Sequence, residues 1–189
     1  YVLCGQYEKT IASNIEAAAA DEEYLEYDSE LSIYHVYLLH NIHFQMYGAL
    51  FSGQYEPAIR AAREMQATVK PEYLLSDFAF LVNYLEAFYG MKAHVLIRFG
   101  KWQEILDEPL PDDPKMFCVT TAVWQYAKGI AHAVLGNIDA ALVQQKLLKE
   151  AVAALPEDRI VFQNDARDIL AVAGPMLAGE LEYRRGNYD

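Results

Sequence analysis

Apolar residues recur every three or four positions along most of this chain, the spacing that places them on one face of an α-helix. The pattern is clearest over residues 34–51, where the apolar face comprises Val36, Leu39, Ile42 or His43, Met46 and Ala49 or Leu50. Gly53 ends this helix, because glycine adopts the left-handed conformation without steric cost. A second helix is expected from Tyr55 until Pro71, with Ala58, Ile59, Ala62 and Met65 on its apolar face. The pattern therefore predicts two helices joined by a tight turn.

The same turn recurs along the chain as a glycine, one spacer and an apolar or aromatic residue. The five examples are Gly5-Gln6-Tyr7, Gly53-Gln54-Tyr55, Gly100-Lys101-Trp102, Gly136-Asn137-Ile138 and Gly186-Asn187-Tyr188. Four of them are expected to open the second helix of a pair. Further helices are predicted over about 102–106, 116–135, 138–155 and 165–185, and Pro175 is expected to kink the last one or to mark its true start. A recurring unit of this kind indicates a repeat architecture.

The residues around these turns resemble the tetratricopeptide repeat (TPR) family. In that family a small residue precedes the turn glycine by seven positions, an aromatic follows it by two, and a second small residue follows it by five. The matching sets are Gly129, Gly136, Ile138 and Ala141; Gly179, Gly186 and Tyr188; Ala93, Gly100 and Trp102; Gly53, Tyr55 and Ala58; and Gly5 and Tyr7. The sequence departs from the pattern at Ile138, which stands in place of the aromatic, and at Met46 and Ile105, which stand where small residues are expected.

A narrower likeness, carried by residues 37–44 and 98–106, is to long, poorly characterised TPR proteins best known from bacteria. The resemblance implies an all-α fold, an α-α superhelix of about four to five helix pairs with long inter-repeat loops. It also implies that residues 1–189 form a single TPR-like domain, which we interpret as a fragment of a longer repeat protein.

In the TPR family the first helix of each pair lines a concave groove. Carried over position by position, the groove would comprise His40, His43, Tyr47, Phe51, His94, Arg98, Tyr126, Ile130, Glu180, Tyr183 and Arg184. This lining is apolar and aromatic, and only Arg98 and Arg184 could clamp a carboxylate. We therefore expect an interaction scaffold that binds a peptide or a partner helix of another protein, alone or within a larger assembly.

An alternative function is metal binding, with a metal-dependent enzyme as its extension. His40 and His43 lie three residues apart on one helix, so they share a face, and the groove register places His94 on the next first helix. Three imidazoles could ligate zinc or copper. The other interpretation is that these are partly buried histidines bonded to backbone or tyrosine, and no cofactor is otherwise expected.

Composition narrows the function classes. The chain has 189 residues, 53% of them hydrophobic, and a formal charge of -12. This charge disfavours nucleic acid and anionic membranes as partners. No phosphate loop, dinucleotide fingerprint or nucleophile elbow is present, so no enzyme class is assigned.

The remaining features support simple interpretations. Cys4 and Cys118 are expected to be two reduced, buried thiols, and the acidic residues from Asp21 to Glu30 are expected to form a solvated loop. No stretch is apolar enough to span a membrane, and no signal peptide is expected before residue 1. We therefore expect a soluble protein without membrane insertion and take the cytoplasm as the default compartment.

Overall fold

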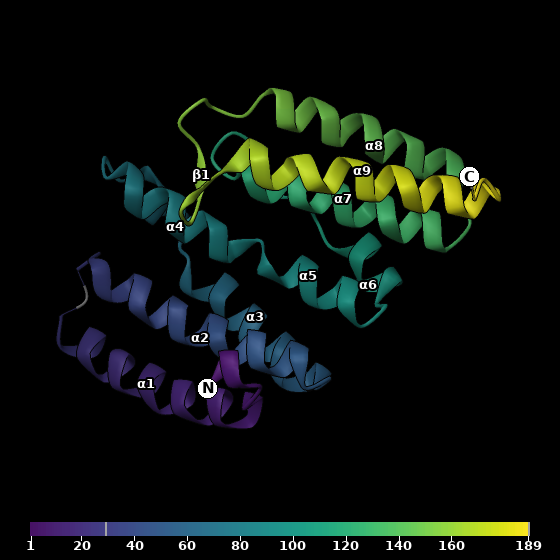
Figure 1. The fold of residues 1–189 in the computed structure, drawn as a ribbon. Helices are drawn as coiled ribbons and strands as arrows, with labels where there is room; N and C mark the ends of the chain where they lie inside the picture. The colour runs from purple at the N-terminus through teal and green to yellow at the C-terminus, as the bar shows by residue number, and fades with distance from the viewer. Residues whose placement is uncertain (29, 189) are drawn as a thin grey trace. The chain divides into compact units, whose positions relative to one another are not determined.

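The computed structural model describes residues 1–28 and 30–188, and these are mostly helical (Figure 1). The elements are η1 (Val2–Cys4), α1 (Tyr7–Tyr27), α2 (Ile33–Phe51), α3 (Tyr55–Thr68), η2 (Pro71–Leu75), α4 (Ala79–Tyr89), α5 (Met91–Arg98), α6 (Trp102–Asp107), α7 (Cys118–Val134), α8 (Ile138–Ala153), β1 (Ile160–Val161), β2 (Asn164–Asp165) and α9 (Ala166–Arg185). The strands form a small antiparallel hairpin in which Ile160 faces Asp165 and Val161 faces Asn164. The predicted all-α class is confirmed.

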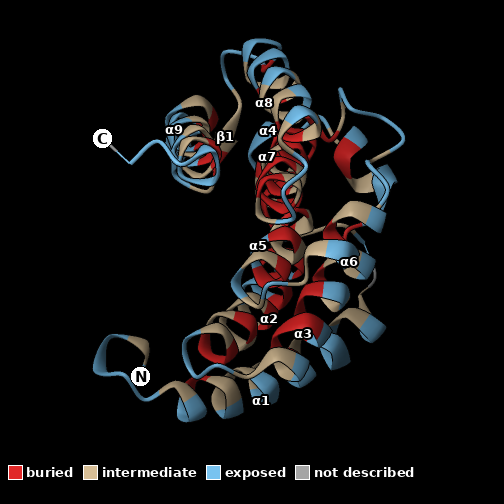
Figure 2. Cartoon of the chain, turned by 90° about the vertical axis from the view of Figure 1, so that its right-hand side faces the viewer, coloured by how far each residue is buried: buried red, intermediate tan, exposed pale blue. Residues whose placement is uncertain are grey.

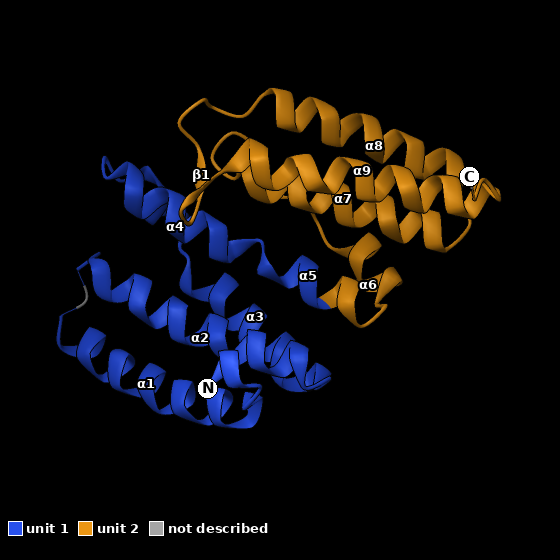
Figure 3. Ribbon diagram, viewed as in Figure 1, with its two compact units in different colours: residues 1–95 blue, residues 96–189 orange. Residues whose placement is uncertain are grey.

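The chain divides into two compact units, residues 1–95 and 96–189, and the boundary falls inside α5 (Figure 3). Each unit has its own packed helices and is described by itself. That all 189 residues form a single domain stays a prediction.

In unit 1, α2 packs between α1 and α3, and the residues that face the neighbouring helices are buried (Figure 2). On α2 these include Leu39, Ile42 and Met46, none more than 2% exposed. Gly48 marks the closest approach of α1 and α2. A Cβ atom there would lie 2.9 Å from Cγ1 of Ile11 and 3.1 Å from the carbonyl oxygen of Tyr7.

Two expectations for unit 1 were wrong. Residues 21–27 belong to α1 rather than to a loop, because a run of alanines and glutamates has high helix propensity and carries the helix onward. Cys118 is buried as expected, but Cys4 is exposed, since it ends a three-residue 3-10 helix that has no buried residue.

In unit 2, α7 packs against both α8 and α9. Trp124, Leu148 and Leu177 are buried at 1%, 2% and 0% exposure. Gly129 lets these helices approach, because a Cβ atom there would lie 2.6 Å from Cδ2 of Leu177. Helix α9 begins at Ala166 and contains Pro175, so Pro175 does not mark its start. Pro175 and Ala171 are both exposed, so water can bond the Ala171 carbonyl that the missing proline N–H leaves free.

A lysine side chain from α7 caps the C-terminal end of the short helix α6. Lys128 Nζ donates hydrogen bonds to the carbonyl oxygens of Ile105, Leu106 and Glu108 at 3.2, 2.9 and 2.6 Å. An ammonium group is well suited to the carbonyl end of a helix, where the helix dipole is negative. Desolvation by burial lowers the pKa of Lys128.

Replacing Lys128 with methionine is expected to lower the free energy of unfolding of unit 2 by about 2 kcal/mol, because carbonyls at the end of α6 would lose a charged donor. Urea unfolding followed by tryptophan fluorescence measures this directly. The matched control is Lys146→Met, since the Lys146 side chain is 78% exposed and pairs with Glu150 at 3.7 Å. Equal stabilities of the two variants would contradict the capping role.

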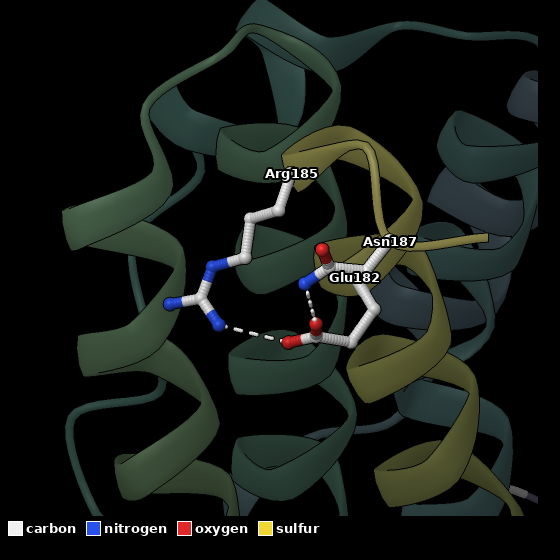
Figure 4. A network of polar contacts seen from close by, with 3 residues as sticks. All are labelled: Glu182, Arg185 and Asn187. Atoms are coloured by element: carbon white, nitrogen blue, oxygen red, sulfur yellow. Dashed lines mark hydrogen bonds and ion pairs between the residues drawn. The ribbon is translucent and has the colours of Figure 1, made fainter. Parts of the chain in front are cut away.

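The five turn glycines share one backbone conformation, with φ between 65° and 84°. In the last turn the Glu182 carboxylate accepts hydrogen bonds from Nδ2 of Asn187 at 2.5 Å and from Nη1 of Arg185 at 2.8 Å (Figure 4). Both bonds hold the pKa of Glu182 below its usual value, and the bond from Asn187 has the larger effect. The side chains of α9 thus fix the turn that follows it.

Candidate binding surface on helix α2

Aromatic rings follow one another along the whole length of α2, and α1 adds a ring at each end. We call this set the aromatic stripe: Tyr24, Tyr34, Tyr37, His40, Phe44, Tyr47, Phe51 and Tyr7. At one end, ring centroids are 4.1 Å apart for Tyr24 and Tyr34 and 6.0 Å for Tyr34 and Tyr37. Further along α2 they are 4.6 Å apart for His40 and Phe44, 6.3 Å for Phe44 and Tyr47, and 4.6 Å for Tyr47 and Phe51. At the other end, the rings of Phe51 and Tyr7 are 5.4 Å apart.

The aromatic stripe is accessible to solvent. Tyr37 and Phe51 are each 52% exposed, while Tyr24 and Tyr34 are 37% and 38% exposed. From Tyr34 to Phe51 the stripe extends about 25 Å at the rise of an α-helix. Extended exposed apolar surface on a folded unit marks an interaction site more often than isolated exposed residues do.

His43 borders the aromatic stripe on the side of α4. Its ring lies 6.0 Å from Phe44, 6.4 Å from Tyr47 and, edge to face, 5.6 Å from Phe88. The pKa of His43 is lowered to about 4, mainly by burial and in smaller part by the positive charges that His40 and His94 can carry. The imidazole of His43 is therefore neutral at pH 7.

His40 and His94, the two other candidate ligands, lie close enough to His43 to influence its charge. Both side chains reach solvent, yet protein atoms crowd them enough to disfavour the charged form, so that desolvation lowers the pKa of each. Among residues 1–28 and 30–188, however, no three His, Cys, Asp or Glu side chains form a group that could hold a metal ion. The positions of His40, His43 and His94 therefore give no support to a metal site, and metal binding stays a prediction.

Unit 2 carries the other predicted groove residues. Tyr126 on α7 faces α9, where its hydroxyl lies 4.0 Å from Sδ of Met176. On α9, Glu180 pairs with Arg184 at 2.8 Å, and Arg184 lies over the Tyr183 ring at 5.4 Å. Ile130 is only 8% exposed and belongs to the core, whereas Arg98 is exposed at the end of α5.

The groove prediction included His40, His43, Tyr47 and Phe51 but missed other rings of the aromatic stripe. Phe44, Tyr34 and Tyr37 could have been found, because aromatic residues at 34, 37, 44, 47 and 51 recur at helical spacing. Tyr7 and Tyr24 could not, because their position depends on how α1 is aligned along α2.

Comparison with known proteins gives no further guide. No protein-family model matches the chain, and no curated protein or solved structure matches it. No helix within the described part of the chain is long and apolar enough to cross a membrane.

Proposed function

We propose that this protein is a TPR-type interaction scaffold and that the aromatic stripe on α2 binds an apolar peptide segment or helix of a partner protein. The observation that carries the proposal is the row of partly exposed rings at helical spacing on α2, with ring contacts from Tyr34 to Tyr37 and from His40 to Phe51. Aromatic rings contribute large contact areas at little entropic cost and dominate the binding energy of many interfaces.

The repeat geometry supports this proposal. Gly53 and Gly136 adopt the same positive φ, and after each of them a helix returns to pack against the preceding one, α3 on α2 and α8 on α7. In the TPR arrangement that we propose, such pairs stack into a superhelix whose first helices line a concave groove. The aromatic stripe belongs to a first helix, as groove residues do in that family.

The chemistry of the aromatic stripe suits binding rather than catalysis. Its rings carry no nucleophile that a neighbouring base activates, and His43 beside it is neutral at pH 7 because of its burial. A helix lying along the stripe could place apolar side chains at positions i, i+3 and i+7 against successive rings.

Peptide selection tests the proposal. Random peptides of about 16 residues, long enough to span the stripe as a helix, are displayed on phage and selected against the whole chain. Selected peptides are expected to bind Tyr47→Ala at least about tenfold more weakly, because truncating a central aromatic side chain of an interface costs 2 kcal/mol or more. Fluorescence anisotropy of synthetic peptides gives the dissociation constants.

The control variant is Tyr27→Ala. Tyr27 is 91% exposed at the end of α1 and is not part of the aromatic stripe, so this change is expected to leave binding unaltered. The proposal is wrong if no peptide is enriched, or if selected peptides bind wild type and Tyr47→Ala equally.

A further inference from the structure

One end of the aromatic stripe is a cluster of tyrosines from two helices. Tyr24 comes from the last turns of α1, while Tyr34 and Tyr37 come from the first turns of α2, and the rings contact in sequence at 4.1 and 6.0 Å. We call these three residues the tyrosine cluster. Their exposed fractions of 37%, 38% and 52% leave ring surface open to a ligand.

The charge around the tyrosine cluster is strongly one-sided. Between Lys9 and Arg60 the sequence has no lysine or arginine, and six of its eight carboxylates lie in the last turns of α1 or just after it: Asp21, Glu22, Glu23, Glu26, Asp28 and Glu30. Asp28 accepts a hydrogen bond from the Tyr24 hydroxyl at 3.4 Å. Desolvation and the Asp28 charge both raise the pKa of Tyr24, so the phenol stays neutral. A cation arriving here meets a negative potential, because the one lysine of this hairpin, Lys9, lies at the opposite end of α1. Outside the hairpin, the basic side chain of Lys70 lies over Tyr73 and adds to burial in lowering the pKa of His35.

Three tyrosine rings elsewhere in the chain have a cation of the chain over them. Lys9 lies over Tyr1 at 5.9 Å, Lys70 over Tyr73 at 5.5 Å and Arg184 over Tyr183 at 5.4 Å. No lysine or arginine of the described residues lies over the rings of the tyrosine cluster. A ring face attracts a cation through its quadrupole, and the attraction grows when both are partly shielded from water.

We propose that the partner segment is basic, and that its lysine or arginine side chains lie on the tyrosine cluster while its apolar side chains follow the rest of the aromatic stripe. This inference rests on the proposed function and adds the chemistry of the partner to it. The favoured occupant is thus an amphipathic helix with cations at one end of its apolar face. We choose this partner because its positive charge complements the negative charge of the α1–α2 hairpin.

A pair of labelled peptides tests the inference on the whole chain. Each is a helix of about 18 residues, matching the length of the stripe. One is built from leucine and lysine, and the other has glutamate in place of every lysine. We expect the lysine peptide to bind and the glutamate peptide to bind at least about tenfold more weakly, with the difference shrinking in about 0.3 M salt because screening weakens the attraction.

The double variant Tyr34→Leu/Tyr37→Leu separates ring recognition from attraction to negative charge alone. Leucine keeps apolar surface and leaves the net charge unchanged, while the ring faces and the hydroxyl groups are lost. Binding of the lysine peptide is expected to weaken about fivefold, in line with cation–π energies at partly exposed sites. The single variant Asp28→Asn should also weaken binding of the lysine peptide, whereas Glu150→Gln in unit 2 should leave this binding unchanged.

The outcomes distinguish this inference from the proposed function. Equal binding of the two peptides, or a lysine peptide that binds the tyrosine variant as tightly as wild type, overturns the basic partner. If Tyr47→Ala still weakens both peptides in that case, the aromatic stripe remains a binding surface for a partner of different charge. If none of the stripe variants affects either peptide, both proposals are wrong.

Discussion

Replacing Gly48 with valine is expected to lower the free energy of unfolding of unit 1 by about 3 kcal/mol, because the added side chain would overpack a close contact between two helices. A Cβ atom at this position would lie 3.1 Å from the backbone oxygen of Tyr7 as well as 2.9 Å from the Ile11 side chain. The side chain can rotate away, but the backbone can move only if α1 shifts. That shift would also draw the Tyr7 ring away from Phe51, so peptide binding at this end of the aromatic stripe should weaken together with stability.

Urea unfolding followed by circular dichroism measures the change, and Gly179→Val is the matched control. Gly179 is also helical, but nothing lies within 4 Å of a Cβ atom placed there. Because valine has a higher helix propensity than glycine, this control should be neutral or slightly stabilising. If both variants unfold at the wild-type urea concentration, α1 and α2 do not approach each other as closely as the structure indicates.

Acidifying the protein from pH 6.5 to pH 4 is expected to destabilise unit 1, with His43 contributing about 3 kcal/mol of the loss. The pKa of His43 is about 4 in the folded chain, against an ordinary value of 6.5. Between these values the unfolded chain binds a proton that the folded chain does not, so stability rises with pH in this window. The stability is fully present above pH 6.5 and is lost as the pH falls through the folded pKa.

The variant His43→Phe keeps an aromatic ring beside Phe44 and Phe88 but cannot bind a proton. Its unfolding free energy, measured by urea titration at several pH values, should depend less on pH than that of wild type. His40→Phe is the control, because His40 is exposed and its titration should matter less. If His43→Phe loses as much stability in acid as wild type, His43 is not the group responsible.

The repeated glycine turns allowed much of the fold to be predicted. Helices were expected over about 34–51, 102–106 and 138–155, and the structure has them at Ile33–Phe51, Trp102–Asp107 and Ile138–Ala153. These predictions succeeded because the signals are local: a glycine that must adopt positive φ, followed by residues with helical apolar spacing.

Features that depend on tertiary contacts were harder to predict. Helix α1 buries only Thr10 and Ala18, so its apolar pattern is weak and its acidic end was interpreted as a loop. The β1–β2 hairpin was missed because two-residue strands carry almost no periodicity. The small residues that precede a turn glycine by seven positions differ in their packing. Gly129 allows a close approach to Leu177, but nothing would lie within 4 Å of a Cβ atom at Gly179.

The candidate site was predicted only in part for the same reason. A groove register places Tyr47 and Phe51 on one face, but the sequence cannot show that Tyr7 and Tyr24 complete the row, because that depends on the alignment of α1 with α2. The lysine that caps α6 was also missed. Lys128 lies 20 to 23 residues from the carbonyls it binds, and no local sequence pattern predicts such a contact.

Each unit can be followed by its own optical signal, a dye on the exposed cysteine of unit 1 and the tryptophans of unit 2. A maleimide dye should attach to Cys4, which is exposed, and leave the buried Cys118 unmodified in the native chain. Both tryptophans, Trp102 and Trp124, belong to unit 2, so their emission follows that unit alone. Dye and indole signals recorded in one sample can therefore report whether the two halves melt together, and whether a ligand protects only the half it touches.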